Sequence, residues 1–245
     1  MTAVDRYFDV LADRLDLLRR TSGAAIEAAA VACATTLEAK GVIHIFDTGH
    51  LVSDEFFTRA GGLAAVVPLR ISVVVDDPHP VREVDAVAVE STIPDLVTAA
   101  IARSRLQYDD VLIVASTSGT AALPVELCQR ASERGLTTVA LTSIEYSTQL
   151  APRHPSGKRL ADVGDIVIDS AAPYGDGLLD MDGVAHPCCP FSGIGAATAL
   201  WAVVARAIEL VTADGTAPTV YPSVNLPDGP TLVDRARARY ADLGF

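Results

Sequence analysis

The sequence predicts an α/β fold in which layers of helices pack on a buried parallel sheet. Short aliphatic runs, such as residues 111–115 and 137–141, alternate along the chain with longer segments of helical pattern. Strands that alternate with helices pair in parallel through right-handed crossovers. Aliphatic residues dominate while aromatic residues make up only 5%, which suits strands that are buried on both faces.

Length and composition indicate one globular domain. The chain has 245 residues, of which 50% are hydrophobic and 20% are charged. This length fits a single domain, and the apolar content is enough for a sizeable core, so we expect little disorder. The predicted domain covers residues 1–245, with N-terminal helices at 1–40 and an extended tail at 212–245.

Charge and cysteine content exclude several classes of protein. The formal net charge is -12, and phosphate backbones repel a chain this acidic, so we predict no nucleic-acid partner. The four cysteines form no CxxC pair, and Cys188, Cys189 and His186 are too closely spaced for one unstrained metal centre. We therefore predict no metal and a cytoplasmic location. Residues 1–20 alternate charged and apolar side chains, unlike a signal peptide or a membrane span.

Hydrophobic periodicity places the elements along the chain. An amphipathic helix over residues 1–20 is interrupted at 21–23 and followed by an alanine-rich helix over 24–39. The prolines of the tail predict an extended path and then a final short helix. The predicted strands are 42–46, 64–69, 111–115, 137–141 and 166–168. The other predicted helices are 53–60, 94–105, 121–134 and 192–211.

A loop of small hydroxyl residues follows the strand predicted at 111–115. Its residues are Ser116, Thr117, Ser118, Gly119 and Thr120. A helix begins directly after the loop, and the N–H groups and positive dipole end of a helix start favour an anion. One hydroxyl is sufficient to cap a helix, so four hydroxyls in five residues indicate an anion site. Ligands of open parallel sheets bind at this end of the strands.

The loop after the first predicted strand belongs to the same edge of the sheet. Its residues are Asp47, Thr48, Gly49 and His50. Gly49 permits a tight turn, and His50 is able to act as an acid or base near neutral pH. Alternatively, Asp47 caps the next helix and His50 lies on the surface. Thr142 and Ser143 follow the strand at 137–141 and bring further hydroxyls to this edge.

Charged residues near these loops have two possible roles. Glu55 and Arg59 share one face of the helix predicted at 53–60, where they form either a surface ion pair or part of the site, with Glu55 as a base. A basic run at 153–159 is unusual in this acidic chain and is either a solvated loop or a segment folded over a bound anion. Its charged or titratable residues are Arg153, His154, Lys158 and Arg159.

Together these stretches resemble the SIS (sugar isomerase) domain family, and most closely bacterial proteins that consist of a single SIS domain. The similarity covers nearly the whole chain. It rests on the hydroxyl loop, on Pro124, Val125 and Glu126 after it, and on Thr142 and Ser143. Further matching stretches are residues 48–50, 59–63, 153–160 and 222–225.

The resemblance implies a three-layer α-β-α sandwich with a five-stranded parallel sheet of the flavodoxin-like type, plus an N-terminal helical extension. It implies a sugar or sugar-phosphate ligand, no obligatory cofactor, and a homodimer or homotetramer with active sites near subunit interfaces. Members of the family are aldose–ketose isomerases or phosphosugar sensors. Carried over to this chain, the phosphate loop is Ser116, Ser118 and Thr120.

Two positions depart from the family pattern. Related proteins have Gly where this chain has Asp47, and Ser where it has Leu51. A carboxylate at the mouth of the first loop repels a second phosphate but accepts hydrogen bonds from the hydroxyl groups of a sugar. We therefore expect a substrate with at most one anionic group, held by the second loop, with Asp47 in contact with the hydroxyl end.

The resemblance also suggests a mechanism. Aldose–ketose isomerisation moves a proton between C1 and C2, so it needs a base, a group that opens the sugar ring and a donor that stabilises the enediolate. We expect Glu55 to be the base, with Glu126 as the second candidate. We expect His50 or His154 to open the sugar ring. We expect Arg59, Arg153 or Lys158 to stabilise the enediolate.

Two other functions are consistent with the same residues. A sensor binds the sugar phosphate without catalysis and changes its association with another protein. Acidic residues offset the basic ones in residues 1–40, which disfavours a DNA-reading segment there. A deaminase or lyase on an amino-sugar phosphate uses the same acid–base residues and is the third hypothesis.

Overall fold

A computed structural model of the chain describes residues 1–49, 55–74, 86–213, 215 and 217–245. Its centre is a five-stranded sheet in the order β2-β1-β3-β4-β5, in which all neighbouring strands run parallel. The strands are β1 (Ile43–Asp47), β2 (Val66–Pro68), β3 (Val111–Ala115), β4 (Thr137–Thr142) and β5 (Ile166–Asp169). The predicted five-stranded parallel α/β fold is confirmed.

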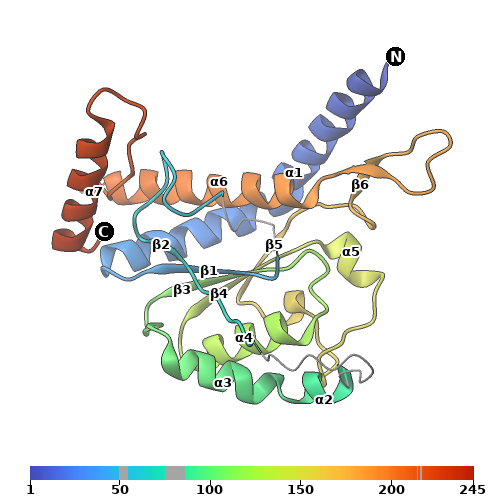
Figure 1. Cartoon of the computed structure of the whole chain (residues 1–245), viewed down its shortest axis with the longest axis horizontal. Coiled ribbons are helices and arrows are strands. Elements are labelled where there is room, and N and C mark those ends of the chain that lie inside the picture. The colour runs from blue at the N-terminus through green and yellow to red at the C-terminus, as the bar shows by residue number, and fades with distance from the viewer. Residues whose placement is uncertain (50–54, 75–85, 214, 216) are drawn as a thin grey trace.

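Helices cover both faces of this sheet (Figure 1). On one face lie α1 (Ala3–Glu38) and α6 (Ser192–Ala213), and on the other lie α3 (Ile93–Arg103) and α4 (Ala122–Glu133). The N-terminal turns of α1 extend beyond the sheet, and α7 (Gly229–Leu243) lies at the opposite end of the molecule (Figure 1). The shorter helices are α2 (Ala86–Ser91) and α5 (Ile144–Thr148).

Burial on both faces explains the continuous aliphatic sequence of the central strand. Successive side chains of a strand point to opposite faces. In β3, Ile113 belongs to the core cluster under α1 and α6, while Leu112 and Val114 belong to the cluster under α3 and α4. All three are at most 2% exposed. A strand with helices on both sides therefore cannot alternate apolar and polar residues.

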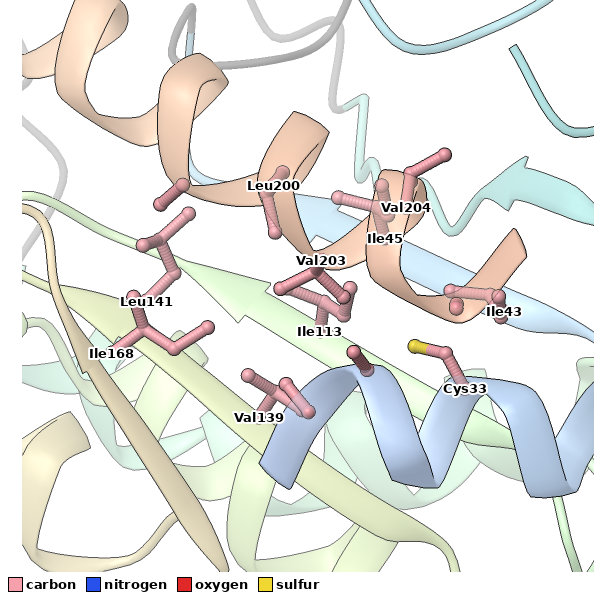
Figure 2. Packing of buried hydrophobic residues seen from close by; sticks show 14 of the residues in the cluster. Cys33, Ile43, Ile45, Ile113, Val139, Leu141, Ile168, Leu200, Val203 and Val204 are labelled. Atoms are coloured by element: carbon pink, nitrogen blue, oxygen red, sulfur yellow. The ribbon is translucent and has the colours of Figure 1, made fainter. Parts of the chain in front are cut away.

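The face under α6 is close-packed. Leu200 and Val203 of α6 lie over Ile45 of β1 and Ile113 of β3, with Cys33 of α1 beside them (Figure 2). Within the described residues, α6 is the one helix long and apolar enough, by length and composition, to cross a membrane. Its buried residues recur at intervals of three and four and face this core, which accounts for its composition.

Two predicted helices differ in the structure. The predicted interruption at residues 21–23 is wrong: α1 runs through it without a break. Ser22 is buried there, and its hydroxyl donates to the carbonyl of Asp169 at 2.8 Å. The helix predicted at 53–60 is not formed over its described part, because residues 55–60 make turns and Thr58 has a φ of 54°.

The second half of the chain contains elements that periodicity did not predict. Helix α5 follows β4 directly, and a short antiparallel hairpin is formed by β6 (Gly177–Leu179) and β7 (Cys188–Pro190). These elements are only three to five residues long, so they carry too few residues for a periodic pattern. The tail ends in α7, which is longer than the short helix that was expected.

We expect Leu200→Ala to lower the free energy of unfolding by about 2–5 kcal/mol, because it leaves a cavity between α6 and the sheet. Leu200 is 1% exposed. Chemical denaturation monitored by circular dichroism measures this change. Leu226→Ala removes the same atoms from a side chain that is 50% exposed, and it should cost less than about 1 kcal/mol. Equal losses in the two variants would contradict the packing described for α6.

Candidate functional site

The order of the strands places a crevice at the carboxyl ends of β1 and β3. The chain goes from β1 to β2 on one side and returns to β3 on the other, so the loops after β1 and β3 diverge and leave space between them. A cavity of about 290 Å³ lies there. Its described lining residues are Thr48, Gly49, Ser116, Thr117, Ser118, Tyr146, Asp176 and Ser192.

A second, more apolar hollow of about 540 Å³ shares Thr48 and Gly49 with this cavity. Asp47 also lines it, together with Arg70. The remaining described lining residues come from β1, from the segments around β2 and from the start of α4: Ile45, Phe46, Phe57, Pro68, Leu69, Ile71, Ser72, Ala121, Leu123 and Pro124. The two cavities together form one crevice along the β1 loop.

Residues 116–120, the β3 loop, are fixed through their carbonyl groups. The carbonyls of Thr117, Gly119 and Thr120 accept hydrogen bonds from the N–H groups of Ser143, Leu160 and Arg153 at 2.9, 2.8 and 2.9 Å. In a trans peptide the N–H points opposite to the carbonyl. The N–H group of the residue after each of these carbonyls therefore points away from the segment that binds the carbonyl. Within the described part of the chain, no acceptor pairs with the N–H groups of residues 117–120. Such unpaired backbone donors favour an oxyanion.

Gly119 is required by the shape of this loop. Its φ is +60°, and a Cβ at this position would lie 2.5 Å from Thr142 Oγ1 and 3.3 Å from Leu160 Cβ. Any side chain would therefore combine an unfavourable backbone conformation with a steric clash. The absence of a side chain lets the β3 loop pack directly against the end of β4.

The hydroxyl groups of the β3 loop differ in position. Ser116, Thr117 and Ser118 line the cavity of about 290 Å³. Thr120 is buried, and its Oγ1 donates to Ser118 Oγ at 3.4 Å. The structure thus brings Ser116 and Ser118 to the cavity, while Thr120 orients Ser118 from behind.

Thr142 and Ser143, both predicted to bind substrate, are buried behind the β3 loop. Thr142 Oγ1 donates to the carbonyl of Thr117 at 3.1 Å. Ser143 Oγ donates to the carbonyl of Ala172 at 2.6 Å and caps α5 by accepting from Tyr146 N at 3.0 Å. Their hydroxyls are therefore engaged in bracing the loop and α5, which explains why hydroxyl residues stand at the end of β4.

The β1 loop reaches the crevice with part of its predicted residues. Thr48 N donates to the carbonyl of Ala115 at 3.2 Å and thus extends the pairing of β1 with β3. Asp47 Oδ1 accepts from Gly49 N at 3.0 Å, which holds the carboxylate at the mouth of the loop. His50 and Leu51 lie outside the described residues, so their predicted roles stay predictions.

Glu55 and Arg59 form the ion pair that was one of the two interpretations of their spacing. Arg59 Nη1 lies 2.9 Å from Glu55 Oε2, and the two side chains are 52% and 42% exposed. Neither residue lines the two cavities of the crevice. Phe57, between them in sequence, does line the larger one. Glu55 is thus next to the crevice, and its role as a base stays a prediction.

His154 is held in a buried hydrogen-bonded chain. Its Nε2 lies 2.8 Å from Glu126 Oε2, and its Nδ1 accepts from Ser156 N at 3.2 Å. A carboxylate can only accept, so Nε2 carries the proton. Glu126 also accepts from Arg130 Nε at 2.8 Å. Burial alone would raise the pKa of Glu126, but the hydrogen bonds and charges of His154 and Arg130 outweigh it and keep that pKa below its usual value.

This buried chain lies beneath the β3 loop and not in the crevice. His154 is 9% exposed, and neither His154 nor Glu126 lines either cavity. Arg153, the residue before His154, donates its N–H to the carbonyl of Thr120. The side chains of His154 and Glu126 were candidates for proton transfer. Their burial favours a structural role, in which they anchor the segment that holds the β3 loop.

The basic residues around His154 point in different directions. The guanidinium of Arg153 forms an ion pair with Glu90 on α2. Arg159 donates from Nη2 to the carbonyl of Leu150 at 2.9 Å. Lys158 is exposed, and neither Arg153 nor Lys158 lines the described crevice. Their predicted contacts with a substrate stay predictions.

Tyr146 and Ser192 line the cavity of about 290 Å³ but lie in stretches without a recognisable motif. Tyr146 projects from α5, and its ring meets that of Tyr174 edge-on with centroids 5.2 Å apart. Asp176 Oδ1 accepts from Ser192 N at 2.6 Å, and its Oδ2 accepts from Ser192 Oγ at 2.7 Å, so it fixes the start of α6. Long-range contacts of this kind leave no local sequence signal.

No three His, Cys, Asp or Glu side chains come together as a metal site in the described part of the chain. Cys188 and Cys189 lie on β7 with their sulfur atoms 3.9 Å apart. Burial raises the pKa of both other thiols, Cys33 and Cys128, to about 12. These two cysteines are therefore core residues that stay protonated at neutral pH.

Comparison with known proteins gives matches over most of the chain. A family model described as the SIS domain matches residues 6–143. A UPF0309 protein of Listeria monocytogenes serotype 4b is 33% identical over 249 residues, which cover 99% of each chain. A UPF0309 protein of Geobacillus thermodenitrificans is 32% identical over 225 residues, covering 91% of this chain and 89% of the relative.

A solved structure shares the fold. The structure of a phosphoheptose isomerase from Francisella tularensis superimposes with a TM-score of 0.52 at 16% identity, covering 84% of this chain and 98% of that one. At this level of identity the similarity concerns the arrangement of the sheet and helices.

We expect Gly119→Ala to lower the free energy of unfolding by about 1–3 kcal/mol more than Gly157→Ala. Gly157 has a similar φ of +71°, but no atom lies within 4 Å of a Cβ built there. The control therefore contains the backbone strain without the clash against Thr142. Denaturant titration measures both losses. If the two variants lose equal stability, the clash with Thr142 makes no contribution to the free energy of unfolding, which would contradict the close packing of the β3 loop on β4.

We expect Glu126→Gln to be less stable than the wild type by roughly 1–3 kcal/mol at neutral pH. The pKa of Glu126 is depressed in the folded protein. Its contribution is therefore present above the unfolded carboxyl pKa of about 4.3 and is lost as the pH falls through the lower folded value. The stability curves of variant and wild type should converge in acid, as unfolding at a series of pH values would show.

Glu133→Gln is the matched control for this variant. Glu133 also pairs with Arg130, at 3.1 Å, but its side chain is 63% exposed. An exposed ion pair contributes less than about 1 kcal/mol, so this variant should follow the wild type at every pH. A difference between Glu126→Gln and the wild type that does not change with pH would contradict the buried charge.

Proposed function

The chain belongs to the SIS domain family, and from this premise we propose that it binds a sugar phosphate in the crevice between β1 and β3 and interconverts its aldose and ketose forms. The observation that carries the proposal is the β3 loop. The backbone N–H groups of residues 117–120 are unpaired among the described residues, and Ser116 and Ser118 line a cavity of about 290 Å³ beside them. Such a loop at a strand end is a site for an oxyanion.

The phosphate group is held by neutral donors in this proposal. The described lining of the smaller cavity contains no Lys or Arg, and its carboxylate, Asp176, already accepts from Phe191 N and from two atoms of Ser192. Backbone amides and hydroxyls stabilise an oxyanion without a fixed positive charge. One phosphate fits this site, in agreement with a substrate that carries a single anionic group.

The sugar chain extends from this site into the larger hollow. Asp47 lies at the mouth of the β1 loop, where its carboxylate accepts hydrogen bonds from the hydroxyl groups of the sugar. Phe57 and Leu123 give that hollow apolar walls for the carbon chain. Arg70 is the cation in its described lining, and we assign to Arg70 the stabilisation of the enediolate. Arg59, Arg153 and Lys158 were the candidates from the sequence, and none of them lines this hollow.

The proton transfer between C1 and C2 is assigned to Glu55. It is a partly exposed carboxylate two residues before Phe57, which lines the hollow. The alternative base, Glu126, is buried and accepts from both Arg130 and His154. A carboxylate that is already paired on both oxygens is a poor base, because proton uptake would break those pairs.

We expect Glu55→Gln to retain ligand binding but to lose exchange of the substrate C2 proton with solvent by a factor of about 10²–10⁴. A thermal-shift panel of sugar phosphates identifies the ligand, and proton NMR in D₂O then measures the exchange. Glu38→Gln, an exposed carboxylate on α1, serves as the control. Ser118→Ala should weaken binding instead.

Two outcomes would count against this assignment. Exchange at the wild-type rate in Glu55→Gln would remove Glu55 as the base. Binding of a sugar phosphate by the wild type without any exchange would replace the isomerase with a binding protein of the sensor type.

A further inference from the structure

A second polar cavity lies on the other side of the segment that borders the crevice. Phe57 lines the large hollow of the crevice, whereas the next three residues line a separate cavity of about 380 Å³. The opposite wall of this cavity is formed by the tail and α7. Its polar lining includes Arg59 from the first wall, and Tyr221, Ser223, Asn225 and Arg237 from the second. We call it the tail cavity.

Backbone hydrogen bonds hold the two walls together. Gly61 N donates to the carbonyl of Tyr221 at 2.8 Å, and Tyr221 N donates to the carbonyl of Gly62 at 2.9 Å. Leu63 and Val220 continue this as an antiparallel bridge. The tail is thus attached to the segment after β1 although the two are separated by most of the sequence.

The floor of the tail cavity depends on a glycine. A Cβ on Gly229, the first residue of α7, would lie 2.2 Å from the carbonyl oxygen of Val224. Gly229 N also donates to the carbonyl of Leu226 at 2.8 Å, and Asn225 N donates to Ser223 Oγ at 3.2 Å. The start of α7 therefore packs directly on the turn that carries Ser223 and Asn225. These contacts between the start of α7 and residues 223–226 shape the cavity.

The charge of the tail cavity is positive, in a chain whose net charge is -12. Arg59 and Arg237 line it from opposite walls, and no carboxylate is among its described lining residues. Arg59 pairs with Glu55 at 2.9 Å and Arg237 with Asp234 at 3.4 Å, and the two arginine side chains are 52% and 61% exposed. Exposed ion pairs of this kind contribute little to the stability of the fold. Both guanidinium groups can therefore turn from their carboxylate partners to a ligand at a small cost in free energy.

We propose that the tail cavity is a second anion site, which binds the phosphate group of a small hydroxylated molecule between Arg59 and Arg237. Two guanidinium groups on opposite walls fit a tetrahedral dianion, because each can donate to a different pair of oxygens. Tyr221, Ser223 and Asn225 supply neutral polar groups for the hydroxylated part. The inference does not require the reaction proposed for the crevice, although Arg59 is the ion-pair partner of Glu55.

Trp201 provides a local signal for this site. It is the single tryptophan of the chain, and its ring stacks on that of Phe56 with centroids 4.2 Å apart. A Cβ built on Gly62 would lie 3.6 Å from this ring. Residues 56 and 62 flank the wall that carries Arg59, so an anion that repositions this wall should change the fluorescence of Trp201.

The test is a fluorescence titration of the full chain with inorganic phosphate at constant ionic strength. We expect a saturable change in the wild type, and an apparent Kd at least about tenfold higher in Arg59→Gln and in Arg237→Gln. Arg237→Lys keeps the charge but not the planar fork, so it should fall between these values. Circular dichroism checks that each variant is folded.

Controls separate the tail cavity from charge effects and from the crevice. Arg19→Gln removes an equal charge from an 82% exposed side chain on α1, and it should titrate like the wild type. Ser118→Ala alters the β3 loop and should leave the Trp201 response unchanged, even if the function proposed for the crevice is wrong. Acetate, a planar monoanion, should bind more weakly than phosphate.

Three results would overturn the proposal. The first is a wild type that shows no saturable response to phosphate. The second is a pair of arginine variants that titrate like the wild type or like Arg19→Gln. The third is acetate binding as tightly as phosphate, which would contradict the assignment to a tetrahedral dianion.

Discussion

The parallel pairing of β1 with β3 is the constraint on which the site depends. Because β2 is added on the far side of β1, the chain must cross back before it forms β3, and the two loops diverge at that point. The space between the β1 and β3 loops follows from this reversal. The core clusters on both faces fix the two strands relative to each other, so the loops have a rigid base.

The two anion sites proposed for this chain differ in their physical basis. In the β3 loop, distant segments bind the carbonyl groups and leave the N–H groups as donors, so an acidic protein needs no cation there. In the tail cavity, two exposed guanidinium groups supply the charge directly. The wall between the crevice and the tail cavity is the segment around Phe57 and Arg59. A displacement of this segment would therefore change the shape of both the crevice and the tail cavity.

Local patterns predicted the parts of the protein whose physical cause is local. The central strands are buried on both faces, so their aliphatic runs at 111–115 and 137–141 were recognisable. The β3 loop was recognisable because its hydroxyls and its glycine are adjacent in sequence. The break in α1 was predicted wrongly, since Ser22 resembles a helix breaker until its bond to β5 is seen. The predicted helix does not form over residues 55–60, because a pattern of side chains does not reveal the turn at Thr58.

The sequence by itself determined the fold class, the five-stranded parallel sheet implied by its family resemblance, and the edge of the sheet where we propose that an anion binds. Only the tertiary structure decided what individual polar residues do. His154 and Arg59 were both predicted to take part in the reaction, yet His154 is buried against Glu126 and Arg59 lines a cavity with Arg237. Their partners are distant along the chain. Burial and pairing depend on such long-range contacts, and these exist only once the chain has folded.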